Sequence, residues 1–320
     1  MEYRKLGKYG IRVSAVSLGS WLTYGNASSD QSAEQCVDRA YELGINFFDT
    51  ANVYAGGEAE RVVGKALAKY ERSSYVLATK VFFPMGSGPN DRGLSRKHIF
   101  EQCHKSLARL GVDYIDLYQC HRYDPSTPLE ETLVALDDLA RQGKILYYGV
   151  SEWSAQQIAH ATDVIRLRGL HPIVSNQPQY NMLNRNIEKE VIPVCEREGI
   201  GQVVFSPLAQ GLLTGKYKPG QPLPEGSRAS DPKQNMFMGG GKLDDSLLES
   251  IQKLQPIAAE SGLSMAQLAL AWCLRKENIS SVIIGASKTS QVDDNVVAAD
   301  TKLSAHVAAK IDEALGKSEA

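Results

Sequence analysis

The sequence predicts an α/β fold: a closed (β/α)8 TIM barrel with an N-terminal β-hairpin and two extra helices. Eight short apolar runs are each followed by a longer segment with helical periodicity. Such alternation implies parallel strands joined by right-handed crossovers. Eight units in 320 residues favour a closed barrel over an open doubly wound sheet. No change in composition marks a boundary, so we expect residues 1–320 to form a single domain.

The elements are predicted in chain order from their patterns. Residues 3–6 and 11–14 flank a turn bounded by glycines, which is typical of a hairpin. The apolar runs lie at 16–18, 45–48, 75–79, 114–118, 145–150, 173–175, 201–205 and 282–284. The helical segments that follow them lie at 32–43, 58–69, 95–109, 128–141, 155–167, 187–197, 265–275 and 291–298. Residues 243–259 and 303–315 have helical periodicity but follow no strand, and they predict the two extra helices.

One connection is longer than the others. Residues 206–243 are rich in Gly, Pro, Ser and Lys, and they include three consecutive glycines at 239–241. Long loops without secondary structure are usually functional lids or disordered segments. We therefore expect residues 206–243 to act at the site rather than to build the barrel.

The composition excludes several classes of protein. The hydrophobic fraction of 43% and the charged fraction of 22% are ordinary for a globular chain, and the net charge of −2 gives no reason to expect a nucleic-acid or anionic membrane partner. Five cysteines without a C-x-x-C pair fit a reducing compartment. The first residues lack an apolar signal core, and no run of about 18 apolar residues occurs. We expect a cytoplasmic protein without membrane insertion, and no metal site is predicted.

Polar residues close three consecutive apolar runs. Asp49, Lys80 and His121 end the second, third and fourth run, and Tyr54 follows five residues after Asp49. Active sites of (β/α)8 barrels lie at the carboxyl ends of the strands, and neighbouring strands are about 5 Å apart. These four side chains should therefore meet at one end of the barrel.

This combination of groups suits proton transfer to a carbonyl. A free phenol has a pKa of about 10, and a nearby ammonium stabilises the phenolate, so we expect Lys80, held by Asp49, to lower the pKa of Tyr54. His121 would then bind the substrate oxygen. Taken singly, each residue has an ordinary explanation: a helix cap, a tyrosine that packs on the surface, a solvated lysine or a structural histidine. Their joint position on three strand ends favours catalysis.

Several segments resemble a known family. Phe47-Phe-Asp-Thr-Ala-Asn-Val-Tyr, Ala78-Thr-Lys and Asp116-Leu-Tyr-Gln-Cys-His resemble the catalytic signature of the aldo-keto reductases. Four further segments are similar to the branch that contains the potassium-channel β subunits and their bacterial relatives: Arg92-Gly-Leu-Ser-Arg-Lys-His, Phe205-Ser-Pro-Leu-Ala-Gln-Gly, Gly226-Ser-Arg-Ala-Ser and Ala271-Trp-Cys-Leu-Arg. The resemblance covers almost the full chain.

The resemblance implies a catalytic tetrad and a cofactor. Asp49, Tyr54, Lys80 and His121 match the tetrad, with Tyr54 as the general acid. The cofactor is a nicotinamide dinucleotide, usually NADPH or NADP+, bound extended across the barrel mouth without a Rossmann fold. The matching cofactor contacts are Ser20, Trp21, Asp49, Ser151, Glu152, Gln177, Phe205, Ser206, Pro207, Leu208, Ala209, Gln210, Lys216, Arg228, Gly285, Ser287, Lys288, Gln291, Asp294 and Asn295.

Individual roles follow from the same resemblance. Ser151 and Gln177 would bond the nicotinamide amide, and Phe205 would stack on the nicotinamide ring. Many relatives have Asn or Arg where this chain has Glu152. Its carboxylate would either bond the carboxamide or turn away.

The residues after the eighth apolar run independently indicate an anion site. Gly285-Ala-Ser-Lys288 opens a helix, whose N-terminal amides attract phosphate, and barrel phosphate sites commonly follow strands seven and eight. Ser287, Lys288 and Arg228 favour NADPH over NADH. The alternatives are an ordinary capped helix start and a solvent-facing Lys288.

Aromatic residues just after the apolar runs are the candidate walls of the substrate pocket. They are Trp21, Tyr24, Phe83 and Trp153, with Phe82 and Tyr123 as further candidates. Aromatics at a barrel mouth would favour an apolar or aryl carbonyl. The alternative for each of them is that it only packs the loops.

Two hypotheses from different classes remain. The first is an NADPH-dependent oxidoreductase that reduces aldehydes or ketones to alcohols, reversibly, with a small-molecule carbonyl substrate. The second is a cofactor-sensing regulatory β subunit of a membrane channel with weak or no turnover. Many channel β subunits carry Asn at the fourth tetrad position, so His121 favours the enzyme. An isomerase or lyase is a weaker third hypothesis.

The branch includes dimers, tetramers and octamers, so a homo-oligomer is one option.

Overall fold

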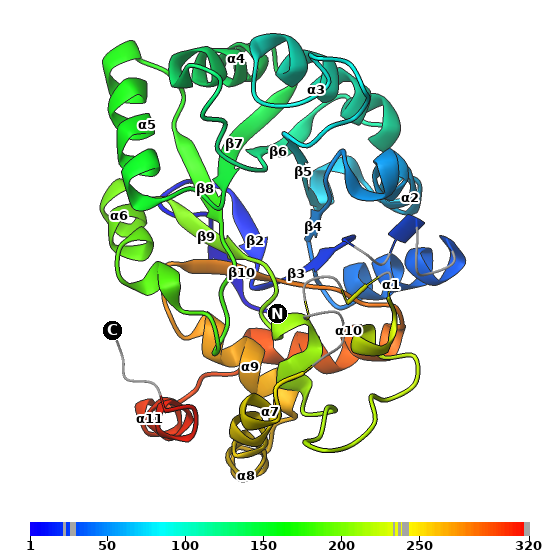
Figure 1. Cartoon of the computed structure of the whole chain (residues 1–320). Coiled ribbons are helices and arrows are strands. Elements are labelled where there is room, and N and C mark those ends of the chain that lie inside the picture. Colours follow the sequence, from blue (N-terminus) through cyan, green and yellow to red (C-terminus); the bar gives the residue numbers. More distant parts are fainter. Residues whose placement is uncertain (22–23, 26–29, 233, 236–237, 239–242, 317–320) are drawn as a thin grey trace.

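Eight parallel strands close into a barrel (Figure 1). In barrel order after β10 (Ile279–Ile284) come β3 (Val16–Gly19), β4 (Phe47–Asp49), β5 (Val76–Val81), β6 (Ile115–Cys120), β7 (Ile145–Ser151), β8 (Ile173–Gln177) and β9 (Gly201–Val204). β9 pairs with β10, which closes the ring. This computed structural model describes residues 1–21, 24–25, 30–232, 234–235, 238 and 243–316. The predicted (β/α)8 barrel is confirmed.

Helices surround the ring of strands (Figure 1). Those that follow strands are α1 (Asp30–Glu42), α2 (Glu58–Leu67), α3 (Arg96–Leu110), α4 (Leu129–Arg141), α5 (Ala155–Arg168), α6 (Val191–Glu198), α9 (Met265–Leu274) and α10 (Thr289–Val296). Local sequence sets their ends. Ser154 and Ser264 form capping boxes with the glutamines three residues later, and Gly111 and Gly169 end α3 and α5 in the left-handed conformation.

The half of the barrel interior nearer the amino-terminal ends of the strands, here called the lower half, is apolar. Successive strand residues face opposite sides of a sheet, so Phe47, Ala78 and Leu117 point inward while Phe48 and Tyr118 face the helices. The hairpin of β1 (Tyr3–Lys5) and β2 (Arg12–Ser14) adds Leu6 and Val13 to this inner cluster. All five inward-facing residues have no exposed surface. The predicted hairpin is present, and it closes this end of the barrel interior.

A glycine fixes where the hairpin docks. Gly7 has φ = 61°, and a Cβ there would lie 2.2 Å from the carbonyl oxygen of Gly199. The Lys8 amide donates to the same oxygen at 3.0 Å. Since β9 begins at Gly201, the hairpin covers the amino-terminal end of the strands and leaves the carboxyl end open.

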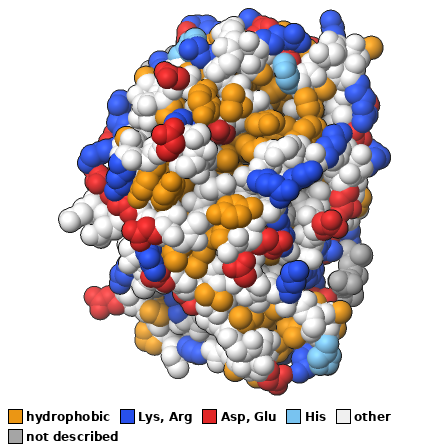
Figure 2. Space-filling view, turned by 180° about the vertical axis from the view of Figure 1, so that it is seen from behind, with side chains coloured by type: hydrophobic (Ala, Val, Ile, Leu, Met, Phe, Trp, Pro, Cys, Tyr) orange, Lys and Arg blue, Asp and Glu red, His pale blue; other side chains and the backbone are white. Residues whose placement is uncertain are grey.

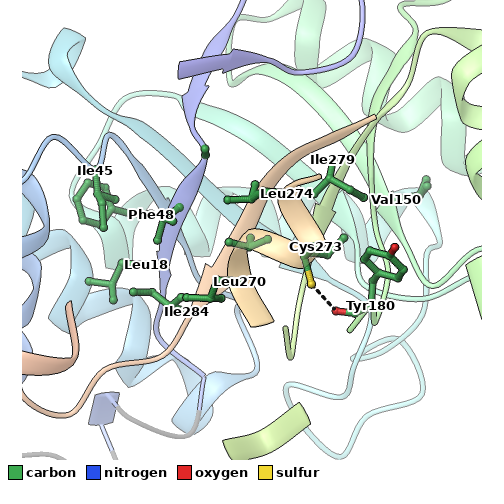
Figure 3. Close-up of a cluster of buried hydrophobic side chains, with 14 of the residues drawn as sticks. Leu18, Ile45, Phe48, Val150, Tyr180, Leu270, Cys273, Leu274, Ile279 and Ile284 are labelled. Carbon is green, nitrogen blue, oxygen red and sulfur yellow. Dashed lines mark hydrogen bonds between the residues drawn. The ribbon is translucent and has the colours of Figure 1, made fainter. Parts of the chain in front are cut away.

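The outer core lies between the strands and the helices. Figure 3 shows Leu18, Phe48 and Ile284 near Leu270 of α9 in this apolar layer. Cys273 of α9 lies 3.8 Å from the Tyr180 carbonyl oxygen, drawn as a dashed line in Figure 3. All five cysteines are buried and free, and burial raises the pKa of Cys103, Cys120, Cys195 and Cys273 to about 12.

The extra helices differ from the prediction in one respect. The predicted helix at 243–259 is two helices, α7 (Asp245–Gln252) and α8 (Leu254–Glu260). Pro256 causes the break, because it has no N–H to donate to residue 252 and its ring clashes with that carbonyl. The tail helix, predicted at 303–315, is α11 (Ala305–Ala314). Figure 1 places α7, α8 and α11 outside the ring of barrel helices.

The long connection has more structure than predicted. It contains two 3-10 helices, η5 (Ala209–Thr214) and η6 (Arg228–Ser230). Tyr217 is buried between them, and its hydroxyl accepts from the Ala229 amide at 3.2 Å. These contacts pack the segment on the barrel. The three glycines at 239–241 lie outside the described residues.

Over the ranges that the structure describes, no single helix is long and apolar enough to cross a membrane. The segments Asp245–Glu260 and Met265–Leu274 pass that test only as a pair bent by 87°. On the face seen in Figure 2, acidic and basic side chains are interspersed with apolar ones. No charge of one sign dominates this face.

Candidate active site

The site is formed by the next inward-facing residue of each of three strands, two positions beyond the apolar one. Two residues beyond the apolar Phe47, Ala78 and Leu117 come Asp49, Lys80 and Gln119, which therefore also point inward. Strand register aligns Lys80 with Gln119. The barrel thus changes from apolar to polar within one layer, at its open end.

Lys80 and Asp49 form a buried ion pair with satisfied hydrogen bonds. Lys80 Nζ donates to Asp49 Oδ1 at 2.5 Å and to the Thr50 carbonyl oxygen at 2.8 Å. Asp49 Oδ2 accepts from Gln177 Nε2 at 2.9 Å and from Gln119 Nε2 at 3.3 Å. Burial alone would lower the pKa of Lys80, but Asp49 and Tyr54 outweigh it and the pKa is raised. The ammonium therefore stays charged.

The chain after β4 folds Tyr54 back over this pair. The Thr50 amide donates to the Ala78 carbonyl oxygen at 2.9 Å, which fixes the connection on β5. Tyr54 begins η2 (Tyr54–Gly57), where Ala55, Gly56 and Gly57 all have positive φ. This sharp turn leaves Tyr54 Oη 3.4 Å from Lys80 Nζ, which donates to it.

The structure corrects the expected pKa of Tyr54. Burial raises it, the ammonium of Lys80 lowers it, and the carboxylate of Asp49 raises it again; the pKa ends above the ordinary value. Lys80 does lower the pKa of Tyr54, as predicted, but burial raises it by more, so the net shift is upward. Tyr54 is therefore a protonated phenol near neutral pH, which is the form that a proton donor needs.

His121 completes the group at the end of β6. Its amide donates to the Val81 carbonyl oxygen at 2.9 Å, and its ring lies edge-on to Tyr54, with 5.7 Å between the centroids. Burial, then the charges of Lys80 and Arg122, lower the pKa of His121 well below its usual value. Its Nδ1 is buried and has no partner among the described residues. A neutral imidazole with a free nitrogen can hydrogen-bond a substrate oxygen.

A cavity of about 930 Å³ connects these groups to the other predicted contacts. Asp49, Tyr54 and His121 line it, and Lys80 lies behind them with no exposed surface. The predicted residues that also line it are Trp21, Phe83, Ser151, Glu152, Gln177, Phe205, Ser206, Pro207, Leu208, Gln210, Lys216, Arg228, Gly285, Ser287, Gln291, Asp294 and Asn295.

Three predicted cofactor contacts do not line this cavity. The buried Ser20 donates its hydroxyl to Thr50 Oγ1 at 2.8 Å. Ala209 is buried beneath its loop. Lys288 is exposed at the start of α10, so the solvent-facing alternative describes it.

The predicted aromatic walls also divide. Trp21 and Phe83 line the cavity, whereas Tyr24 is 1% exposed and belongs to the core. Trp153 is 2% exposed and packs edge-on against Tyr123, with 4.9 Å between ring centroids. Tyr123 and Phe82 are partly buried against the outer core, and none of Tyr24, Trp153, Tyr123 and Phe82 lines the cavity.

The segment after β9 has a strained backbone where it borders the cavity. Ser206, Ala209 and Gln210 have φ values of 51°, 46° and 61°, in the left-handed region that favours glycine. Asn181 Nδ2 donates to the Ser206 carbonyl oxygen at 3.0 Å and holds this conformation. Such strain is concentrated at ligand-binding segments.

Unpaired buried polar atoms along the cavity fit a long polar ligand. Gln210 Oε1 and Arg228 Nη2 are buried without a partner among the described residues, as is His121 Nδ1. Buried polar atoms are normally hydrogen-bonded, so these three are available to a polar ligand in the cavity. Arg228 also lies over the Trp21 ring, 5.0 Å from its centroid. The residues present therefore fit an extended dinucleotide.

Glu152 takes the second of its two predicted orientations. It has φ = 56°, and its Oε1 accepts from the Gln179 amide at 2.6 Å. The carboxylate is turned toward the chain after β8. It holds the rim of the cavity rather than reaching across it.

Sequence reasoning missed several residues of the site. Gln119, Arg122 and Gln179 were not predicted, although the last two line the cavity and Gln119 bonds Asp49. Gln119 lies two residues before His121, and its period-two spacing from Leu117 was a usable signal. In the described part of the chain, no group of three His, Cys, Asp or Glu side chains is arranged to hold a metal.

Comparisons with known proteins agree with this architecture. The model of the family described as "Aldo/keto reductase family" matches residues 15–315. A protein of Arabidopsis thaliana named "Probable voltage-gated potassium channel subunit beta" is 45% identical over 304 residues, which cover 94% of this chain and 92% of that protein. A protein of the same name from Oryza sativa subsp. japonica has the same identity and coverage.

Proposed function

This chain belongs to the aldo/keto reductase family, and we propose that it reduces aldehydes or ketones to alcohols, reversibly, with NADPH. The observation that carries the proposal is the position of the Tyr54 phenol. It lies 3.4 Å from a charged lysine and edge-on to a neutral histidine, in one cavity. A proton donor, a group that stabilises its anion and a group that holds the substrate oxygen are thus together.

The cavity supplies the residues that would hold the cofactor. Ser151 and Gln177 would lie at the carboxamide, and Phe205 would offer an aromatic face to the ring. Lys216, Arg228 and the start of α10 offer cations and amides to the phosphates. When bound, the reduced nicotinamide supplies a hydride to the carbonyl carbon.

The residues of this chain manage the matching proton. Tyr54 gives its hydroxyl proton to the carbonyl oxygen, and Lys80 stabilises the phenolate that forms. Asp49, held by Gln119 and Gln177, keeps Lys80 charged and in place. His121 positions the carbonyl oxygen, and solvent returns the proton to Tyr54. Carbonyl, hydride and proton together balance to an alcohol.

The test is NADPH oxidation across a panel of aryl and alkyl aldehydes, ketones and sugars. We expect turnover on at least one class and much weaker turnover with NADH. Absence of turnover on every member, with NADPH binding shown by fluorescence titration, would overturn the proposal.

A second function is favoured by the names of the relatives, which describe potassium channel β subunits. In that case the same cavity would sense the cofactor for a membrane partner. Copurification with a membrane protein, together with negligible turnover on the panel, would support this function. The neutral His121 beside Tyr54 supports the enzyme instead.

A further inference from the structure

Arg122 is a cation at the end of the cavity where Tyr54 and His121 lie, and the proposed reaction gives it no role. Arg122 directly follows His121 and lines the cavity. Its Nη1 donates to the His121 carbonyl oxygen at 2.5 Å, and its guanidinium lies 5.5 Å from the centroid of Phe83. Among the described residues, no carboxylate forms an ion pair with it, and its Nε and Nη2 have no protein acceptor. The half-buried guanidinium therefore keeps an open edge.

The acidic groups around Arg122 are engaged elsewhere. Asp49 is paired with Lys80. Asp124 accepts from the Leu94 amide and from the hydroxyls of Ser126 and Thr127. Glu152, on the neighbouring strand end, accepts from a backbone amide on its β8 side. The positive charge at this end of the cavity is thus not neutralised by the protein.

The cofactor phosphates do not account for this charge. The residues that would hold phosphate follow β9 and β10, whereas Arg122 follows β6. In barrel order, β7 and β8 separate β6 from β9, and β3, β4 and β5 separate it from β10. Arg122 lies on the far side of the mouth, next to the proton donor.

The charge of Arg122 reaches both proton-handling groups. After burial and Lys80, it is the next cause that lowers the pKa of His121. It also opposes the burial-driven rise in the pKa of Tyr54, though less than Lys80 does. A substrate whose carbonyl oxygen lies between Tyr54 and His121 would therefore place its other substituents within electrostatic range of Arg122.

We propose that Arg122 binds a carboxylate of the substrate, so that the preferred substrates are carbonyl compounds that carry an acid group. This inference rests on the proposed reductase function. The free Nε and Nη2 edge of a guanidinium matches a carboxylate in two parallel hydrogen bonds. Phe83 and Trp21 supply an apolar wall for the carbon skeleton between the two ends. Arg122 is thus a specificity-determining residue.

The first test compares an acid with its neutral ester. We expect the wild type with NADPH to reduce para-formylbenzoate with a higher kcat/KM than its methyl ester. Arg122→Gln should lower the acid-to-ester ratio about 10- to 100-fold, as loss of a hydrogen bond to a charged group predicts, and Arg122→Lys should fall between. The matched control is Arg92→Gln, at an exposed arginine outside the cavity, which should leave the ratio unchanged. An equal ratio in wild type and Arg122→Gln would overturn the inference.

The second test needs no turnover. Calorimetric titration of the NADP+-saturated protein with benzoate and with benzamide measures the anion preference directly. We expect benzoate to bind more tightly than benzamide, and Arg122→Gln to abolish the difference. If no aldehyde is reduced but benzoate binding depends on Arg122, the reductase proposal fails while the anion site stands. If aldehydes are reduced and benzoate shows no preference, only the anion site is overturned.

Discussion

The two layers inside this barrel use the same strands for opposite purposes. The lower layer, formed by Phe47, Ala78 and Leu117 and closed by the hairpin, is apolar and has no opening. Two residues further along the same strands, Asp49, Lys80 and Gln119 form a buried polar layer, of which Asp49 borders the cavity. The two layers are therefore separated by only two residues on each strand.

The difference teaches where stability and chemistry are located. Apolar burial stabilises the lower layer by about 25 cal/mol per Å². The upper layer contains a buried ion pair, whose desolvation offsets most of its attraction. Variants in the lower layer should therefore change the free energy of unfolding and leave kcat nearly unchanged. Variants in the upper layer should change kcat, and they should change stability as well where they leave a buried charge unpaired.

The largest expected effect is at the proton donor. Tyr54→Phe removes one hydroxyl and leaves the ring in place, so kcat should fall about 10²- to 10⁴-fold while the NADPH dissociation constant changes little. Steady-state kinetics and fluorescence titration measure the two quantities. Turnover equal to that of the wild type would show that Tyr54 is not the donor.

Lys80→Met tests the cost of an uncompensated charge. The variant leaves Asp49 buried without its partner, so we expect about 3–5 kcal/mol less stability in urea unfolding, together with loss of turnover. The double variant Asp49→Asn, Lys80→Met should recover much of the stability and none of the turnover. A single variant as stable as the wild type would contradict this view of the upper layer.

Leu117→Ala tests the lower layer. Removing a fully buried leucine should cost about 2–5 kcal/mol of unfolding free energy and leave kcat within a few-fold of the wild type. Leu167→Ala, at a leucine that is 84% exposed, is the matched control and should cost almost nothing. A large loss of kcat without a loss of stability would reverse the assignment of the two layers.

Gln119→Leu replaces one polar side chain of the upper layer with an apolar one like those of the lower layer. It removes a donor to Asp49 and an acceptor for Gln177, so we expect kcat to fall about tenfold with NADPH binding less affected. Gln202→Leu is the control: this buried strand amide bonds Asn176 and lines no part of the cavity. Equal losses in both variants would mean that Gln119 acts only through folding.

The smallest expected effect is on the pH dependence of stability. The pKa of His121 is lower in the folded than in the unfolded chain, so the unfolded chain binds the proton first as pH falls below about 6.5. Stability should decrease below that pH by up to about 1.4 kcal/mol per unit from this group. His121→Asn should reduce the slope without abolishing it, because burial also lowers the pKa of His98. Urea unfolding between pH 6.5 and pH 5 measures it; an unchanged slope would count against the buried neutral imidazole.

The strand ends could be predicted from the sequence because each apolar run stops at a definite residue and its side chains alternate with a period of two. Asp49 is the last residue of β4, Lys80 is the last but one of β5 and His121 is the first after β6, so their convergence follows from barrel geometry. The eight strand and helix units were confirmed for the same reason. The helix broken at Pro256 and the folded long connection differed from the prediction, and the helix predicted at 187–197 begins only at Val191, after the 3-10 helix Asn186–Glu188.

The rest depended on features that spacing does not encode. Whether Tyr24 and Trp153 face the opening depends on loop backbone, and both face the core. The pKa of Tyr54 depends on the balance between burial and Lys80, which needs three-dimensional distances. Glu152 has a positive φ that a glutamate sequence does not suggest.

The buried cysteines make this chain a convenient object for spectroscopy. Maleimides react with thiolates, and burial raises the pKa of four of the five thiols to about 12 and that of Cys36 as well. The native protein should therefore resist alkylation without any cysteine being removed. A single cysteine introduced at an exposed position of the connection after β9, such as Gln221→Cys, would take a fluorophore selectively and report on that connection in the otherwise natural protein.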